Sequence, residues 1–179
     1  MCCWHRRLVR RLSRPHDGEC DGVQRRDSTS WPVYLLDTNV VSELRRARPH
    51  PAVLDWIQDL PAHQLHVSAV TVGEIQAGIE ITREQDAAKA EELEAWLGTL
   101  LTTYSVLPVD ADAFKVWAWL MHRKSDTLIQ DALIASVAIV NRLTVVTRNV
   151  RDFQQMTVSI LNPFNDPPTV HEGEGTWRR

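Results

Sequence analysis

Short apolar segments alternate with longer amphipathic stretches over most of the chain. Five brief segments contain apolar, often β-branched residues typical of buried parallel strands, and they lie at 33–36, 64–68, 106–109, 143–147 and 158–161. Between them, apolar positions recur every three or four residues, which indicates helices over 52–60, 87–101 and 131–140. Strands that alternate with helices predict an α/β domain with a mainly parallel sheet, here of four to five strands.

Two further helices are marked by residues that favour a helix start. Thr71 precedes one of them, and either Asp110 or Asp112 precedes the other. The apolar face of the second helix is expected to hold Phe114, Val116, Trp117 and Leu120. The helices that carry Trp96, Trp117 and Trp119 offer more aromatic surface than one small domain covers, so a homodimer is expected.

The two ends of the chain lack these patterns. Residues 1–30 hold seven arginines among Ser, Asp and Gly, and are expected to be a disordered basic arm or to precede the true start. Residues 165–179 are rich in Pro, Gly and Glu and are expected to form a loose tail. The folded domain is therefore expected to span residues 31–164.

Composition narrows the class of protein. The chain has 179 residues, of which 44% are hydrophobic and 24% charged, and this suits one globular domain. No segment approaches the roughly 18 continuous apolar residues of a membrane helix. All three cysteines lie at or before Cys20. We therefore expect a cytoplasmic protein without a membrane segment, a disulfide scaffold or a thiolate zinc site.

Acidic residues follow the predicted strands. Asp37 comes directly after the first strand, Glu74 lies in the first turn after the second, and Asp131 opens the helix before the fourth. Functional crevices of parallel sheets lie beyond the carboxyl ends of the strands, so these side chains are expected to converge there. After the fourth strand, either Asn149 or Asp152 could complete the cluster.

Such a cluster has a chemical use. Crowded carboxylates raise one another's pKa unless a cation is present, and their hard oxygens favour Mg²⁺ or Mn²⁺ over zinc. Two such ions about 4 Å apart can activate water and stabilise the leaving oxygen of a phosphodiester, without a Ser, Cys or His nucleophile. Taken singly, each acid is equally well explained as a helix cap or an exposed first-turn residue.

Four motifs, in order, resemble those of PIN domains. Tyr34–Glu43 (YLLDTNVVSE) resembles the opening of the family, and Ser68–Glu74 (SAVTVGE), followed by Gly78, resembles its second acidic motif. Asp131–Ala135 (DALIA) resembles the third and Val146–Phe153 (VTRNVRDF) the fourth. The ending LNPF at 161–164 is similar to that of the FitB-like branch of VapC toxins.

The resemblance implies a three-layer α/β/α fold and an Mg²⁺- or Mn²⁺-dependent endoribonuclease. It also implies a homodimer, and the toxin of a type II VapBC-like system that a cognate VapB-like antitoxin inhibits. Asp37, Glu74 and Asp131 fall on the three acidic metal positions. FitB-like members have Asp where this chain has Asn149, so either Asn149 or Asp152 would be the fourth site residue.

Other polar residues near these motifs have expected roles as well. Asn39 and Thr147 are expected to orient water or Asp37. Three arginines beside the cleft could contact phosphates of the RNA, namely Arg45, Arg46 and Arg148.

Two other functions are compatible with parts of the pattern. A haloacid-dehalogenase-like phosphohydrolase also begins with Asp after a hydrophobic strand, but it needs a second Asp where this chain has Asn39. A PIN domain weakened at its metal site by Asn149 could instead act only as a binding partner. Metal-dependent RNA cleavage would separate the three possibilities.

Overall fold

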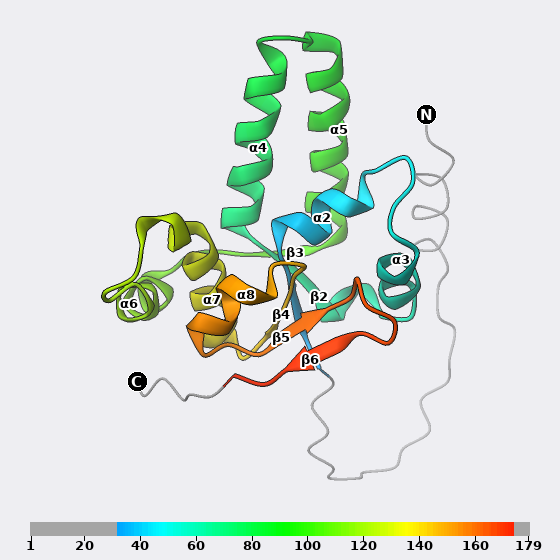
Figure 1. Ribbon diagram of the computed structural model, residues 1–179. Coiled ribbons are helices and arrows are strands. Elements are labelled where there is room, and N and C mark those ends of the chain that lie inside the picture. The colour runs from blue at the N-terminus through cyan, green and yellow to red at the C-terminus, as the bar shows by residue number, and fades with distance from the viewer. Residues whose placement is uncertain (1–31, 174–179) are drawn as a thin grey trace, which may run out of the picture. The chain divides into compact units, whose positions relative to one another are not determined.

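A computed structural model describes residues 32–173 (Figure 1). The basic arm expected at 1–30 and the end of the expected tail, 174–179, lie outside the described residues. The described helices are α2 (Thr38–Leu44), α3 (Pro51–Gln58), α4 (Ala69–Arg83), α5 (Ala87–Thr103), α6 (Ala111–Leu120), α7 (Ile129–Asn141) and α8 (Val150–Phe153). The strands are β1 (Tyr34–Leu36), β2 (Leu65–Ser68), β3 (Ser105–Leu107), β4 (Thr144–Val146), β5 (Ile160–Asn162) and β6 (Thr169–His171).

The strands form one sheet in the order β3-β2-β1-β4-β5-β6. The pairs from β3 to β5 are all parallel, with Leu36 opposite Val67 on one side and Val146 on the other. Because β1 lies between β2 and β4, the carboxyl ends of three strands meet at the centre of one edge. The α/β class and the mainly parallel sheet are confirmed.

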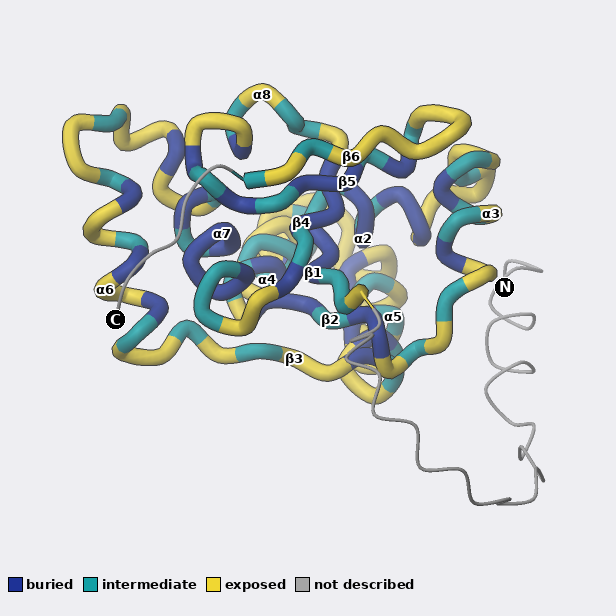
Figure 2. The backbone as a smooth tube through the Cα atoms, turned by 90° about the horizontal axis from the view of Figure 1, so that it is seen from below, coloured by how far each residue is buried: buried dark blue, intermediate teal, exposed yellow. Residues whose placement is uncertain are grey.

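Helices cover both faces of the sheet, as a three-layer fold requires. In Figure 2, α6 and α7 lie on one side of the sheet and α3 on the other. Alternate residues of β1 face opposite sides. Leu35 packs with Val145 and Phe153 in the core beside α6 and α7, whereas Leu36 is fully buried outside that cluster. Each fully buried Leu of this kind stabilises the fold by roughly 1.5–3 kcal/mol.

The sixth strand corrects the expectation of a loose tail after residue 164. Residues Thr169–His171 form β6, which pairs antiparallel with β5. The strand was missed because its side chains are mostly exposed, so no hydrophobic alternation marks it, and Pro and Gly flank it. Its hydrogen-bonding partner is the edge of β5, which the local sequence does not reveal.

Several element boundaries also differ from the expected ones. Ser68 rather than Thr71 caps α4, since its Oγ accepts a hydrogen bond from the Val70 N–H at 3.1 Å. Asp110 rather than Asp112 caps α6. The segment expected as a turn at 149–153 contains the short helix α8. Phe114 lies on the exposed side of α6, with half of its surface accessible.

The helices α4 and α5 form a hairpin that projects away from the sheet (Figure 1). Asp86 caps α5 at the tip, where its Oδ1 accepts from the Lys89 N–H at 2.9 Å. Among residues 32–173, no helix is both long enough and apolar enough to cross a membrane.

Candidate active site

Asp37 lies at the carboxyl end of β1, in the centre of the sheet. Its backbone N–H donates to the carbonyl of Val146 at the end of β4, at 3.0 Å. The side chain caps α2 and is only 4% exposed. The sheet therefore fixes this carboxylate beside the ends of two strands, as the sequence predicts.

Three hydrogen bonds hold the Asp37 carboxylate. Oδ1 accepts from the backbone N–H of Thr38 at 2.7 Å. Oδ2 accepts from the Thr147 hydroxyl at 2.7 Å and from the Asn39 amide. Asn39 in turn accepts from the Arg148 backbone N–H at 3.0 Å. Asn39 and Thr147 thus both contact the same oxygen of Asp37, and Thr147 is fully buried.

Glu74 reaches the same edge from the second turn of α4. Its Oε2 accepts a hydrogen bond from the Thr38 hydroxyl, and the contact joins the start of α2 to α4 across 36 positions of sequence. Sequence reasoning assigned no role to Thr38. The available signal was its place in the Asp-Thr-Asn tripeptide directly after β1.

Asn149 connects the two remaining acids. Its Nδ2 donates to Asp152 Oδ2 at 2.7 Å and makes a longer contact with Asp131 Oδ2 at 3.5 Å. Asp131 lies in the first turn of α7 and Asp152 in α8. The Asn149 amide therefore donates hydrogen bonds to both carboxylates from a position between them. Both candidates for the fourth position, Asn149 and Asp152, lie in the cluster.

The acids perturb one another's protonation. Burial raises the pKa of Asp37 to about 6, and the charge of Glu74 adds to the rise while the three hydrogen bonds oppose it. Burial also raises the pKa of Asp131 to about 6, followed by the charges of Asp37, Asp152 and Glu74. The four carboxylates are thus close enough for their charges to interact.

The donor set suits a hard cation. Every candidate ligand offers carboxylate or amide oxygen, which Mg²⁺ and Mn²⁺ prefer. Among residues 32–173, no three His, Cys, Asp or Glu side chains are spaced to hold a metal ion, so the carboxylates would have to move closer together to coordinate one. The raised pKa of Asp131 marks a site where positive charge is favourable. The oxygen atoms of these side chains therefore suit Mg²⁺ or Mn²⁺, although the distances between the side chains do not yet form a coordination site.

The three arginines expected to contact RNA differ in their surroundings. Arg46 forms an ion pair with the buried Glu43 at 3.2 Å. Arg148 is exposed beside the cluster, with its guanidinium 5.1 Å from the ring centre of Phe164. Arg45 lies 6.0 Å from the ring centre of Trp96. Arg45 and Arg148 thus each lie over an aromatic ring, and neither forms an ion pair with a carboxylate of the described residues.

Residues 34–158 match the family model described as the PIN domain. The chain belongs to the PIN-domain family. This membership sets aside the haloacid-dehalogenase-like alternative, which Asn39 already disfavoured. The resemblance that the four motifs indicate is therefore confirmed, and the match covers strands β1 to β4 and the acidic cluster.

This PIN domain has relatives among VapC- and FitB-type proteins. It is 36% identical over 139 residues to plasmid stability protein StbB of Pseudomonas syringae pv. tomato, covering 74% of this chain and 99% of that protein. It is 36% identical over 143 residues to VapC ribonuclease Y4jK of Sinorhizobium fredii, covering 74% and 98% respectively. The crystal structure of FitAcB from Neisseria gonorrhoeae matches with a TM-score of 0.67 at 30% identity, covering 74% of this chain and 99% of that chain.

Proposed function

We propose that this PIN domain is a Mg²⁺- or Mn²⁺-dependent endoribonuclease and the toxin of a type II VapBC-like toxin–antitoxin system. The observation that carries the proposal is that four carboxylates lie close together at the carboxyl edge of the sheet. The negative charges of Asp37, Glu74 and Asp152 all raise the pKa of Asp131. The similarity to a protein named VapC ribonuclease supports RNA as the substrate.

Asp37, Glu74 and Asp131 are the residues that would hold the ion. When bound, the ion supplies an activated water and stabilises the leaving oxygen of the phosphodiester. Thr147 and Asn39 fix one oxygen of Asp37, and Thr38 fixes one oxygen of Glu74. These bonds hold the two carboxylates in place before substrate arrives, which lowers the cost of ordering them during reaction.

The chain's own cations serve the substrate. Arg148 is exposed, and its backbone N–H is bound to Asn39, which contacts Asp37. The backbone of Arg148 therefore lies beside the acidic cluster, and its side chain would offset negative charge that develops on a bound phosphate. Arg46 is less suited to this role because Glu43 already pairs with it.

The proposed function includes partners. A VapB-like antitoxin would inhibit the chain, as the resemblance to VapC toxins implies. The similarity of the chain to the FitAcB structure supports this proposal. The active unit would be a homodimer in the cytoplasm. These assignments follow from the family resemblance and not from contacts within this chain.

A cleavage assay with a matched capping variant tests the nuclease proposal. The purified chain should cleave a fluorescently quenched RNA with Mg²⁺ or Mn²⁺, and EDTA should stop the reaction reversibly. Asp37→Asn, Glu74→Gln and Asp131→Asn should each cost on the order of 100-fold or more, and combining them should add little.

Asp86→Asn is the control for this assay. It also replaces a helix-capping Asp, but at the tip of the α4–α5 hairpin (Figure 1), and it should keep wild-type activity. Wild-type cleavage by the Asp37→Asn variant, or cleavage unaffected by EDTA, would overturn the proposal.

A second candidate function is that of a PIN domain that binds but does not cleave. The contact of the Asn149 amide with both Asp131 and Asp152 favours it, because a neutral side chain stands where an acid would hold a second ion. Wild-type protein without cleavage in Mg²⁺ and in Mn²⁺, despite intact folding, would select this alternative.

A further inference from the structure

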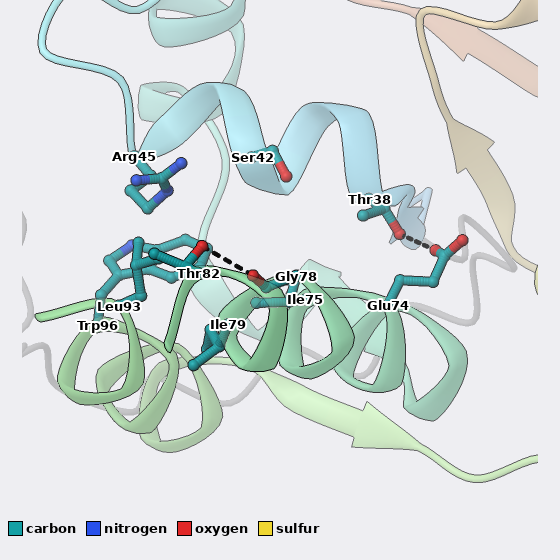
Figure 3. A pocket seen from close by; sticks show the side chains of 10 residues that line it. All are labelled: Thr38, Ser42, Arg45, Glu74, Ile75, Gly78, Ile79, Thr82, Leu93 and Trp96. Carbon is teal, nitrogen blue, oxygen red and sulfur yellow. Dashed lines mark hydrogen bonds between the residues drawn. The ribbon is translucent and has the colours of Figure 1, made fainter. Parts of the chain in front are cut away.

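Of the three arginines near the acidic motifs, only Arg148 is both unpaired and next to the carboxylates of the fourth motif. Arg46 forms an ion pair with a buried glutamate. Arg45 lies with Trp96 at one end of a pocket between α2, α4 and α5, and Glu74 lines the opposite end (Figure 3). The position of the Arg148 guanidinium therefore matters most for the charge of the cluster.

Arg148 does not pair with the acids that surround it. It directly precedes Asn149, whose amide contacts both Asp131 and Asp152. An extended arginine side chain at this position can reach such carboxylates, and guanidinium–carboxylate pairs are strong, charge-assisted contacts. Yet no ion pair among residues 32–173 includes Arg148. Its guanidinium instead lies 5.1 Å from the ring centre of Phe164.

Phe164 is itself fixed at the end of the neighbouring strand. Because β4 and β5 are parallel, the residues that follow them lie at the same edge of the sheet. The Phe164 N–H donates to Oδ1 of Asn162 at 3.0 Å, and the ring centre lies 5.5 Å from that of His50. The His50 N–H donates in turn to Oε1 of the buried Glu43 at 2.9 Å. The ring is thus held by two segments, on the β5 side of the acidic cluster.

We propose that Phe164 is a positioning residue that holds the Arg148 guanidinium on the β5 side of the cluster and away from its carboxylates. The carboxylates then stay available to a divalent cation, and Arg148 stays available to substrate. The second half of the proposal rests on the proposed nuclease function. A cation over an aromatic face and an exposed ion pair are of similar strength, so one ring is enough to compete with the acids.

The proposal has a consequence that a purely structural role of Phe164 does not share. Without the ring, the guanidinium is drawn to Asp131 or Asp152 and occupies oxygen atoms that a cation would need. Removing the ring should therefore weaken metal binding, but only while Arg148 is present. Removing Arg148 should leave metal binding unchanged or make it tighter, because it takes a positive charge away from the site.

The first experiment measures Mn²⁺ binding to the full chain without RNA, from the electron paramagnetic resonance signal of free Mn²⁺. Phe164→Leu should bind Mn²⁺ about two- to five-fold more weakly, the range that corresponds to one cation–π contact at an exposed site. Phe164→Trp should bind like wild type, because an indole also attracts a guanidinium. Phe164→Leu combined with Arg148→Ala should bind no more weakly than Arg148→Ala alone. Thermal melting confirms that each variant folds.

Arg142→Ala provides the matched background. Arg142 is also exposed, but it follows α7 and precedes β4, at the opposite end of that strand from Arg148. Phe164→Leu should weaken Mn²⁺ binding as much in this background as in wild type. Equal weakening in the Arg148→Ala background would overturn the proposal, because Phe164 would then act without Arg148. Unchanged Mn²⁺ binding by Phe164→Leu alone would overturn it as well.

A second experiment separates this proposal from the nuclease proposal, because it needs neither metal nor RNA. The side-chain Nε–H signal of Arg148 is followed by nuclear magnetic resonance in mildly acidic buffer and assigned by its loss in Arg148→Ala. The ring current of Phe164 should displace this signal, and Phe164→Leu should move it towards that of Arg142. If the wild-type chain binds no Mn²⁺ and cleaves no RNA but the signal moves, only the nuclease proposal fails. An Arg148 signal that does not move in Phe164→Leu would overturn the positioning role.

Discussion

Asp37 and Asp131 carry similarly raised pKa values but have very different support. Asp37 accepts three hydrogen bonds, two of them through Oδ2. Among the hydrogen bonds of residues 32–173, Asp131 has only the long contact from Asn149 at 3.5 Å, while burial and three carboxylates raise its pKa. Asp37 is therefore a structural cap as well as a candidate ligand, whereas Asp131 is held in place with little compensation.

Removing the charge of Asp131 should stabilise the metal-free protein. Its pKa rises from 3.8 to about 6 in the folded chain, so folding disfavours the ionised form. The free-energy cost of ionising Asp131 in the folded chain is absent below about pH 4, grows as the pH rises towards 6, and is fully present at pH 7. Asp131→Asn should thus raise the free energy of unfolding in EDTA by about 1 kcal/mol at pH 7, after allowance for solvent screening, and by nothing near pH 4.

Denaturant titration at the two pH values measures this difference. Asp86→Asn should change little at either pH, because Asn caps a helix as well as Asp does. Asp37→Asn should gain less than Asp131→Asn, since the single oxygen of an amide cannot replace both Oδ2, which accepts from Thr147 and Asn39, and Oδ1, which accepts from the Thr38 N–H. An Asp131→Asn chain less stable than wild type at pH 7 would contradict the expected repulsion.

Replacing Asn149 by Asp tests its place in the site. The change removes the donor between Asp131 and Asp152 and adds a charge, so the melting temperature in EDTA should fall. The added carboxylate should also lower the Mg²⁺ concentration for half-maximal cleavage several-fold. Asn165→Asp is the control, because this exposed side chain contacts only Thr169 among the described hydrogen bonds.

Two results would distinguish the roles of Asn149. A lower Mg²⁺ requirement supports its position as fourth ligand. An unchanged requirement with an unchanged melting temperature would contradict any contact between this side chain and the ion.

At the scale of elements, the sequence predicts the helices and strands whose own apolar side chains are buried in a regular pattern. The strands β1, β2, β4 and β5 lie where buried runs predict them, and β3 ends at Leu107 because Pro108 cannot donate to the sheet. Other features depend on partners far away in the sequence. The strand β6 exists through pairing with β5, and the contact of Thr38 with Glu74 links residues 36 positions apart.

The same distinction applies to the site. The positions of Asp37, Glu74 and Asp131 could be predicted, because Asp37 directly follows β1 and the other two lie in the first two turns of recognisable helices. The ion pair of Arg46 with Glu43 and the ring contacts of Arg45 and Arg148 could not, since they depend on side-chain geometry. Whether the three acids bind metal stays a prediction.

Removing β6 should weaken the sheet at β5. A chain that ends after Asn165 leaves the hydrogen-bonding edge of β5 unpaired, and Leu161 of β5 accepts from the Thr147 N–H at 3.0 Å. Its melting temperature should fall by several degrees, the shift expected for about 1–2 kcal/mol. A chain that ends after Gly173 keeps β6 and should melt like wild type. Equal melting of both shortened chains would show that β6 adds no stability.

Helix α6 and the start of α7 carry large apolar side chains that are exposed. Phe114 and Trp119 of α6 are 50% and 47% exposed, and Ile129 at the start of α7 is 37% exposed. Trp117 is partly buried against the core and Trp96 lines the pocket, so of the three tryptophans expected at a dimer contact only Trp119 is strongly exposed. An interface centred on α6 would cover this surface.

Light scattering tests this interface. The antitoxin-free protein should have twice the chain mass of 20.4 kDa, and Phe114→Asp combined with Trp119→Asp should give a monomer. Val170→Asp is the control, because Val170 is also exposed, at 60%, but lies on β6. A wild-type monomer at micromolar concentration would refute the dimer. A double variant that remains dimeric would show that the dimer contact is not on α6.

The adjacency of β1 and β4 decides when during synthesis the acidic cluster can assemble. Asp37 is held by Thr147, which lies 110 positions later, and the two meet only when β4 pairs beside β1. Chains are made from the N-terminus, and contacts between distant segments form late in folding. A nascent chain from which β4 has not yet emerged contains Asp37 and Glu74. It lacks Thr147, which holds Asp37 in place. A ribosome that stalls before this point would therefore release a fragment without the assembled acidic cluster, and the proposed cleavage would require translation through β4.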